Sequence, residues 1–294
     1  MGDRSTIEWT DATWNPIAAF DRVTGRRGWF CTKVSEGCRN CYAESFNKFR
    51  GNGHEYTAQN LPNVRFELVN LDQPFRWRRR PRLIFVNSMT DLFGDFVSDE
   101  DIAEVFKVMY KSPRHIFQVL TKRPERMLDW IIRSAFLSNA PLQNVWLGVS
   151  VEDQKTADER IPVLLQTPAA VRWISAEPLL GSIDLNNCLY TRYLEGGARH
   201  MYNQLDWVVV GGESGPSARP MHPKWARSIR DQCKAADIPF FFKQWGEFVS
   251  VSEVAGPGVH HHFSDGATVR RTGKKLAGRL LDGRDWNEYP EVAA

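Results

Sequence analysis

Short apolar runs alternate with segments of helical periodicity over most of the chain. The apolar runs are Leu83–Val86, Ile116–Leu120, Val145–Val149, Val171–Ile174, Trp207–Val210 and Pro239–Phe242. The segments of helical periodicity include Asp99–Lys111, Glu125–Ser138 and Pro223–Ala235. Buried strands that alternate with helices are typical of a parallel sheet. With one further strand before the first cysteine, the pattern gives about seven strand–helix units and predicts an α/β fold close to a barrel.

Each apolar run is followed by side chains that can form hydrogen bonds or titrate. These strand ends are Asn87–Asp91, Thr121–Pro124, Ser150–Asp153, Ser175–Pro178, Gly211–Gly215 and Lys243–Glu247. In a parallel barrel the carboxyl ends of all strands face one mouth, where ligands bind. We therefore expect the active site at this mouth. The glycine-rich end at 211–215 can hold a carboxylate or phosphate on its amides, or it is simply a tight turn.

Three of the five cysteines, Cys31, Cys38 and Cys41, lie within eleven residues. Three thiolates can ligate three irons of a four-iron cluster and leave the fourth iron open. A zinc site would need a fourth ligand, and the two remaining cysteines are far away in the sequence. An odd number of clustered cysteines favours metal over disulfides. An iron–sulfur cluster, a zinc site and a metal-free loop all stay open at this point.

Composition and charge narrow the class of protein. The 294 residues are 42% hydrophobic and 25% charged, as in a soluble globular protein, and the net charge of +3 is too small to identify a partner. The segment Arg76–Arg82 is densely basic and contains a tryptophan, so it suits a nucleic-acid backbone or is a solvated loop. The chain has no apolar run long enough to span a membrane and no apolar core of a signal peptide near Met1, so we expect a cytoplasmic protein.

The last part of the chain differs in character from the rest. We predict a barrel over residues 1–250, with the cysteine loop at 31–41, and a C-terminal extension over residues 251–294 that packs on the barrel. The three consecutive histidines His260–His262 cannot all point the same way, so they are expected in an exposed loop.

A resemblance to a known family covers almost the whole chain. Besides the cysteine motif, it is carried by Glu8–Pro16, Asn87–Phe93, Gln118–Pro124, Gly148–Glu152, Glu177–Gly181, Gly211–Gly215 and Phe242–Gly246. These blocks resemble a family of phage and prophage proteins with a three-cysteine motif, formerly of unknown function. That family is similar to a divergent branch of the radical SAM enzymes. The first gap between cysteines is six residues here, where three are usual in those enzymes.

The resemblance implies a partial TIM-like barrel of six or seven units and a 4Fe-4S cluster on Cys31, Cys38 and Cys41. It further implies S-adenosyl-L-methionine at the open iron, an electron-donor reductase, and reductive cleavage to a 5′-deoxyadenosyl radical. The cysteines, Lys243 and Glu177 are then the catalytic candidates. By their position, the candidates for cofactor binding are Tyr42, Asn87, Ser88, Thr121, Lys122, Ser150, Glu152, Gly212 and Glu213.

The phage setting and the basic segment Arg76–Arg82 indicate a nucleic acid or nucleotide as the substrate. The expected reaction is an isomerase-like rearrangement of an adduct on a base, as in phage thymidine hypermodification, in the host cytoplasm if the chain is phage-encoded. One alternative is a zinc-binding nucleic-acid module without radical chemistry. A DNA photoproduct-type repair lyase is another.

Overall fold

A computed structural model describes residues 4–134, 137, 140–189 and 204–291 of the chain. The chain forms two compact units, of which the first comprises residues 1–148 and 167–170, and the second residues 149–166 and 171–294. The segment after residue 250 belongs to the second unit, and the predicted boundary there stays a prediction. No helix of the described residues has the length and apolar character to cross a membrane.

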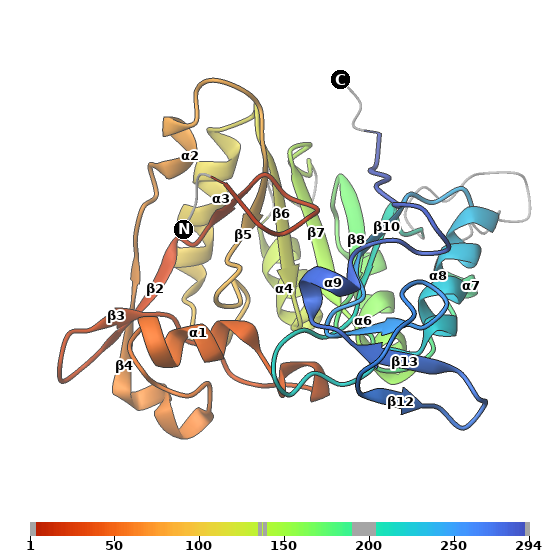
Figure 1. Cartoon of the computed structure of the whole chain (residues 1–294). Helices are drawn as coiled ribbons and strands as arrows, with labels where there is room; N and C mark the ends of the chain where they lie inside the picture. Colours follow the sequence, from red (N-terminus) through yellow and green to blue (C-terminus); the bar gives the residue numbers. More distant parts are fainter. Residues whose placement is uncertain (1–3, 135–136, 138–139, 190–203, 292–294) are drawn as a thin grey trace, which may run out of the picture. The chain divides into compact units, whose positions relative to one another are not determined.

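The predicted parallel strands of the first unit are present, and their hydrogen bonding follows the chain. The strands are β1 (Ala12–Trp14), β5 (Leu83–Val86), β6 (Ile116–Thr121) and the start of β7 (Val145–Ser150). Ala12 of β1 lies opposite Ile84, and Leu83 of β5 lies opposite Ile116. The helices that follow β5 and β6 are α3 (Asp99–Tyr110) and α4 (Pro124–Arg133), as Figure 1 shows.

The start of α3 shows how the sequence sets a helix boundary. The Ser98 hydroxyl accepts a hydrogen bond from the Asp101 amide at 3.0 Å and so caps the helix. Three acidic residues in the first turn stabilise the helix further, because their negative charges lie at the positive end of the helix dipole.

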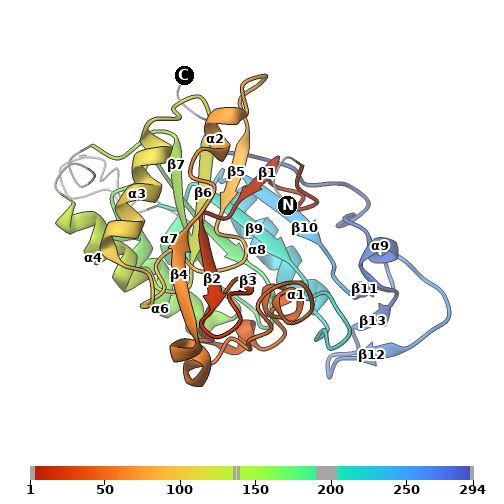
Figure 2. The same cartoon turned by 90° about the vertical axis from the view of Figure 1, so that its left-hand side faces the viewer.

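The first unit also contains a small antiparallel sheet that the apolar pattern does not predict. Its strands are β2 (Ile17–Asp21), β3 (Arg27–Gly28) and β4 (Val64–Leu68), in the order β3-β2-β4. The segment between β3 and β5 also contains η1 (Glu36–Cys38), α1 (Tyr42–Arg50), η2 (Ala58–Asn63) and α2 (Gln73–Arg76). Figure 2 shows β2, β3 and β4 beside α1.

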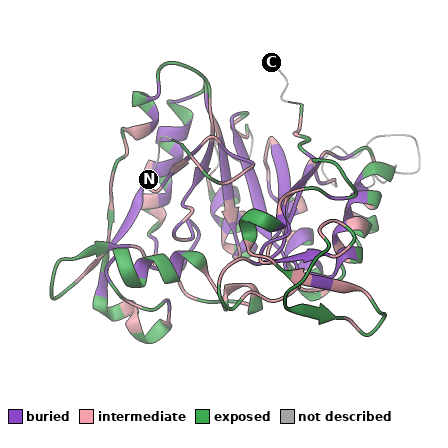
Figure 3. Cartoon of the chain, viewed as in Figure 1, coloured by how far each residue is buried: buried purple, intermediate pink, exposed green. Residues whose placement is uncertain are grey.

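The second unit contains three complete parallel strands after α6 (Gln154–Gln166). They are β8 (Val171–Ala176), β9 (Trp207–Gly211) and β10 (Phe240–Gln244), and their residues are almost all buried. The helices are α6, α7 (Asn186–Leu189) and α8 (Pro223–Ala235). Figure 3 shows these strands as buried.

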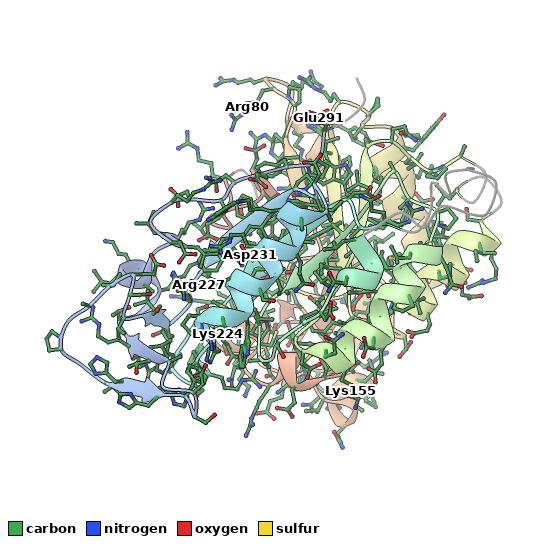
Figure 4. The ribbon with its side chains drawn as sticks, turned by 90° about the vertical axis from the view of Figure 1, so that its right-hand side faces the viewer. Arg80, Lys155, Lys224, Arg227, Asp231 and Glu291 are labelled. Carbon is green, nitrogen blue, oxygen red and sulfur yellow. The ribbon has the colours of Figure 1, made fainter. Side chains whose placement is uncertain are left out.

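The extension after residue 250 packs within the second unit. It adds β12 (His260–His262), β13 (Thr268–Arg271) and α9 (Lys274–Ala277), and β13 pairs with both β12 and β11 (Phe248–Ser250). The three histidines, expected in a loop, therefore form an exposed strand. Ion pairs join α8 to the extension, including Arg227 with Asp282 at 2.7 Å and Lys224 with Asp265 at 2.9 Å. Figure 4 shows Lys224 and Arg227 along α8.

The parallel strands follow the order β1-β5-β6-β7-β8-β9-β10, and the division between the two units falls within β7. Parallel strands in sequence order with intervening helices confirm the predicted α/β class. The order is compatible with a partial TIM-like barrel.

Candidate functional site

The three clustered cysteines lie on one loop of the first unit. Cys38 ends η1, and Cys41 is the residue immediately before α1. Cys31 and Cys41 pack against a small apolar core that contains Phe30 and Tyr56. All three cysteines are half-buried free thiols. The apolar core therefore holds Cys31 and Cys41 in position.

The thiols influence one another electrostatically. Burial and the neighbouring Asp91, Cys41 and Cys38 together raise the pKa of Cys31 to about 12, while Arg123 opposes this change. Burial also raises the pKa of Cys41, and hydrogen bonds from the backbone amides of Glu44 and Ala43 oppose it. Three thiolates in this place would repel one another, and bound metal cations would offset that repulsion.

The three cysteines are not arranged as a formed metal site. In the described part of the chain, no three His, Cys, Asp or Glu side chains lie so that they could hold a metal ion, and this includes Cys31, Cys38 and Cys41. A structural zinc needs four ligands around one centre, whereas in a four-iron cluster each cysteine ligates a separate iron. Three mutually interacting thiols and the amides at the start of α1 fit the anionic cluster in their chemistry.

Asp91 accepts several hydrogen bonds in a buried network beside the cysteine loop. Its carboxylate accepts hydrogen bonds from the Thr121 hydroxyl at 2.7 Å, the Lys122 amide at 3.2 Å and the Arg123 guanidinium at 2.9 Å. Arg123 also donates to the Thr32 hydroxyl at 2.6 Å, next to Cys31. The network therefore connects the carboxyl ends of β5 and β6 to the cysteine loop. Sequence reasoning missed the role of Arg123, although its position after β6 was visible.

The end of β5 brings further predicted residues to the same place. The Tyr42 hydroxyl donates to the Ser88 carbonyl, and the Asn15 side chain donates to the Ser88 hydroxyl at 3.2 Å. Asn87 has a φ of 55° and is buried, and neither polar atom of its side chain has a hydrogen-bond partner among the described residues. Buried amides are normally paired, so an unpaired one indicates a position for water or a ligand. Lys122 acts electrostatically on Cys41.

The second unit contains the other predicted residues. Both carboxylate oxygens of Glu177 accept from the Lys243 ammonium at 2.8 Å, and one accepts from the Gln244 side chain at 3.0 Å. The two catalytic candidates of this unit are therefore in direct contact. A substrate would therefore have to replace one of these contacts to bind either charged group.

Glu152 and Glu213 are engaged in buried ion pairs of the second unit. Glu152 lies 3.0 Å from Arg160, and Glu213 lies 2.7 Å from Arg219. Arg160 also donates to the Ser150 carbonyl at 2.7 Å. These contacts give both carboxylates a structural role. Cofactor binding by Ser150, Glu152 and Glu213 stays a prediction.

Gly212 lies where two backbones approach closely. Its amide donates to the Gln244 carbonyl at 2.9 Å, and a Cβ atom on this residue would lie 1.9 Å from the Trp245 carbonyl oxygen. The Gly215 amide already donates to the Glu247 carboxylate at 3.1 Å. These contacts favour the tight turn over an anion-binding loop.

We expect Gly212→Ala to lower the free energy of unfolding by at least about 2 kcal/mol, because backbone atoms of Trp245, just after β10, would have to move. Urea denaturation measures this loss. The matched control is Gly211→Ala, whose Cβ atom would lie 3.1 Å from side-chain atoms of Glu177 and not from backbone atoms. Equal losses for the two variants would refute the close-approach explanation.

The basic segment Arg76–Arg82 lies at the other end of the strands. It leads into the amino end of β5, and the Arg78 carbonyl accepts from Arg114, which precedes β6, at 2.8 Å. Figure 4 shows Arg80 extending outward there. The cysteine loop contacts the opposite, carboxyl ends of β5 and β6 through Thr90 and Arg123. The structure therefore does not bring the basic segment to the cysteines.

The chain is an α/β protein, and in its first unit the loop with Cys31, Cys38 and Cys41 lies at the carboxyl ends of the parallel strands β5 and β6. A family model described as a protein of unknown function (DUF5131) matches residues 4–290, and the chain belongs to this family. No curated protein and no solved structure matches the chain.

Proposed function

We propose that the protein is a radical SAM enzyme that holds a 4Fe-4S cluster on Cys31, Cys38 and Cys41. The observation that carries this proposal is the position of Cys31, Cys38 and Cys41 on one loop, beside the start of α1 and the carboxyl ends of β5 and β6. Ligands of α/β proteins bind at such strand ends. The order of the parallel strands supports the finer proposal of a partial barrel of the radical SAM type.

The residues of the first unit would bind and orient the reacting groups. When bound, the cluster would supply the electron that cleaves S-adenosyl-L-methionine. The amides of Ala43 and Glu44 stabilise negative charge at Cys41, and the Arg123 network fixes the loop beside Cys31. The unpaired amide of Asn87 can accept and donate hydrogen bonds to a polar ligand.

For the overall reaction we propose the isomerase-like modification of a nucleobase or nucleotide in phage DNA, with a reductase as electron donor and the host cytoplasm as the place of action. The Lys243–Glu177 pair can recognise a phosphate or carboxylate of the substrate if that group replaces Glu177 as the partner of the ammonium.

Anaerobic reconstitution with iron and sulfide tests the chemistry. We expect absorbance at roughly 400 nm, the charge-transfer region of such clusters, and release of 5′-deoxyadenosine from S-adenosyl-L-methionine after reduction. Stoichiometric zinc in the pure protein, with neither signal, would instead support the zinc-binding module. Turnover restricted to irradiated DNA would support the repair lyase.

A further inference from the structure

Helix α1 exposes three aromatic side chains on one face. Tyr42, Phe46 and Phe49 are 57%, 41% and 81% exposed. Their spacing of four and three residues places them in one row along the helix. Large exposed apolar side chains that form a contiguous row commonly mark a binding surface. Figure 3 shows the exposed side of α1 in green.

The buried side of the same helix is polar and holds the row outward. Asn47 is fully buried, and its side-chain oxygen accepts from the Trp29 amide at 2.9 Å. Glu44 is buried as well, pairs with Lys33 at 2.8 Å and accepts from the Tyr56 amide at 2.9 Å. Rotation of α1 that buried the aromatic row would break these contacts. The exposure of the row is therefore built into the fold.

Positive charge surrounds the aromatic row. The Arg26 guanidinium donates to the Phe49 carbonyl at 3.4 Å, so the β2–β3 hairpin reaches the end of α1. The basic residues on α1, on this hairpin and in the cysteine loop are Arg22, Arg26, Arg27, Lys33, Arg39, Lys48 and Arg50. The described ion pairs give three of them an acidic partner, because Lys33 pairs with Glu44, Arg39 with Glu36 and Lys48 with Glu55. Seven positive charges less the four negative ones of Asp21, Glu36, Glu44 and Glu55 leave a net charge of +3 around the row.

We propose that the aromatic face of α1, formed by Tyr42, Phe46 and Phe49, binds single-stranded nucleic acid by stacking on unpaired bases. The surrounding basic residues then contact the phosphates. Rows of aromatic side chains within basic surroundings are the usual means of binding single strands without reading their sequence. Residues three and four apart are separated by about 4.5 and 6 Å along a helix, which suits successive bases better than one free nucleotide.

The face lies directly beside the candidate site, because Tyr42 follows Cys41 and donates to the Ser88 carbonyl. A nucleic-acid strand held on α1 would thus bring a base to the cysteine loop. One held on the basic segment Arg76–Arg82 would not, because that segment lies at the amino ends of the β-strands. The identification of this strand as the substrate rests on the proposed function. The binding itself does not require the cluster.

The test is fluorescence anisotropy with a labelled single-stranded oligonucleotide and its duplex, using protein without added iron. We expect the single strand to bind more tightly than the duplex, and Phe49→Ala to weaken binding about tenfold with no change in salt dependence. Phe49→Tyr should retain the affinity. Arg26→Ala should reduce the slope of log affinity against log salt by about 0.7, as expected for one lost phosphate contact.

The matched control is Tyr110→Ala, which removes a 57% exposed aromatic at the end of α3, close to Lys111 and Arg114 near the basic segment. This variant should bind as the wild type does. The proposal is overturned if Phe49→Ala retains full affinity, if Tyr110→Ala alone loses it, or if the wild type binds no oligonucleotide. Cleavage of S-adenosyl-L-methionine by reconstituted protein, measured without nucleic acid, separates a failure of this proposal from a failure of the proposed function.

Discussion

The Cys41→Ser protein is expected to lose the cluster and, with it, all detectable release of 5′-deoxyadenosine. Three thiolates are the minimum for a four-iron cluster with one open iron, and a serine hydroxyl is a far poorer ligand at neutral pH. Cys41 also lies at the start of α1, where two backbone amides hydrogen-bond to its sulfur. Iron per chain after reconstitution should fall from about four to below about one. Iron analysis and absorbance measure this loss independently of activity.

Cys188→Ser is the matched control for this experiment. Cys188 is a half-buried free thiol of the second unit. Among the described residues, the charged groups that act on its pKa are Asp158 and Asp184, and no cysteine is among them. Its replacement should leave the iron content unchanged. The cluster assignment would be wrong if Cys41→Ser kept a full complement of iron, or if Cys188→Ser lost as much.

Much of the fold was predictable because buried parallel strands are recorded locally in the sequence. The runs at Leu83–Val86 and Trp207–Val210 are continuously apolar, and both became strands with nearly the predicted bounds. The sheet β3-β2-β4 was not predicted, because its strand β4 has alternating exposure and pairs with a segment more than forty residues away. Pairing over such distances depends on tertiary contacts that propensity does not encode.

The candidate site was predictable only in part. The close spacing of its cysteines is visible in the sequence. The Arg123 network is not, because it depends on which strand ends become neighbours in the fold. The basic segment illustrates the same limit, because its composition indicates phosphate binding while only the topology places it at the amino end of β5. Helix α1 shows a further case. Its aromatic row resembles the buried face of an amphipathic helix, but Asn47 and Glu44 take the inward positions through hydrogen bonds.

Asp91→Ala is expected to destabilise the first unit more than any change on its surface. Asp91 and Arg123 have side chains that are only 9% and 8% exposed, and they form an ion pair at 2.9 Å. Removal of the carboxylate leaves the buried guanidinium with only the exposed Asp95, 3.9 Å away, as a counter-charge, and breaking a buried pair typically costs about 3–5 kcal/mol. The Thr121 hydroxyl loses its acceptor as well. Urea denaturation should show a loss of this size in the free energy of unfolding.

The exposed pair of Arg133 with Asp129 provides the matched comparison, since both side chains are more than half exposed at a separation of 2.8 Å. Asp129→Ala should cost less than about 1 kcal/mol, because water replaces the lost partner. A double variant, Asp91→Ala with Arg123→Met, should recover part of the loss, because it removes the uncompensated charge and not merely its partner. If Asp91→Ala lowered the free energy of unfolding as little as Asp129→Ala does, the Arg123 network could not be what holds the cysteine loop in place. The position of Cys31 would then have to depend on its apolar contacts alone.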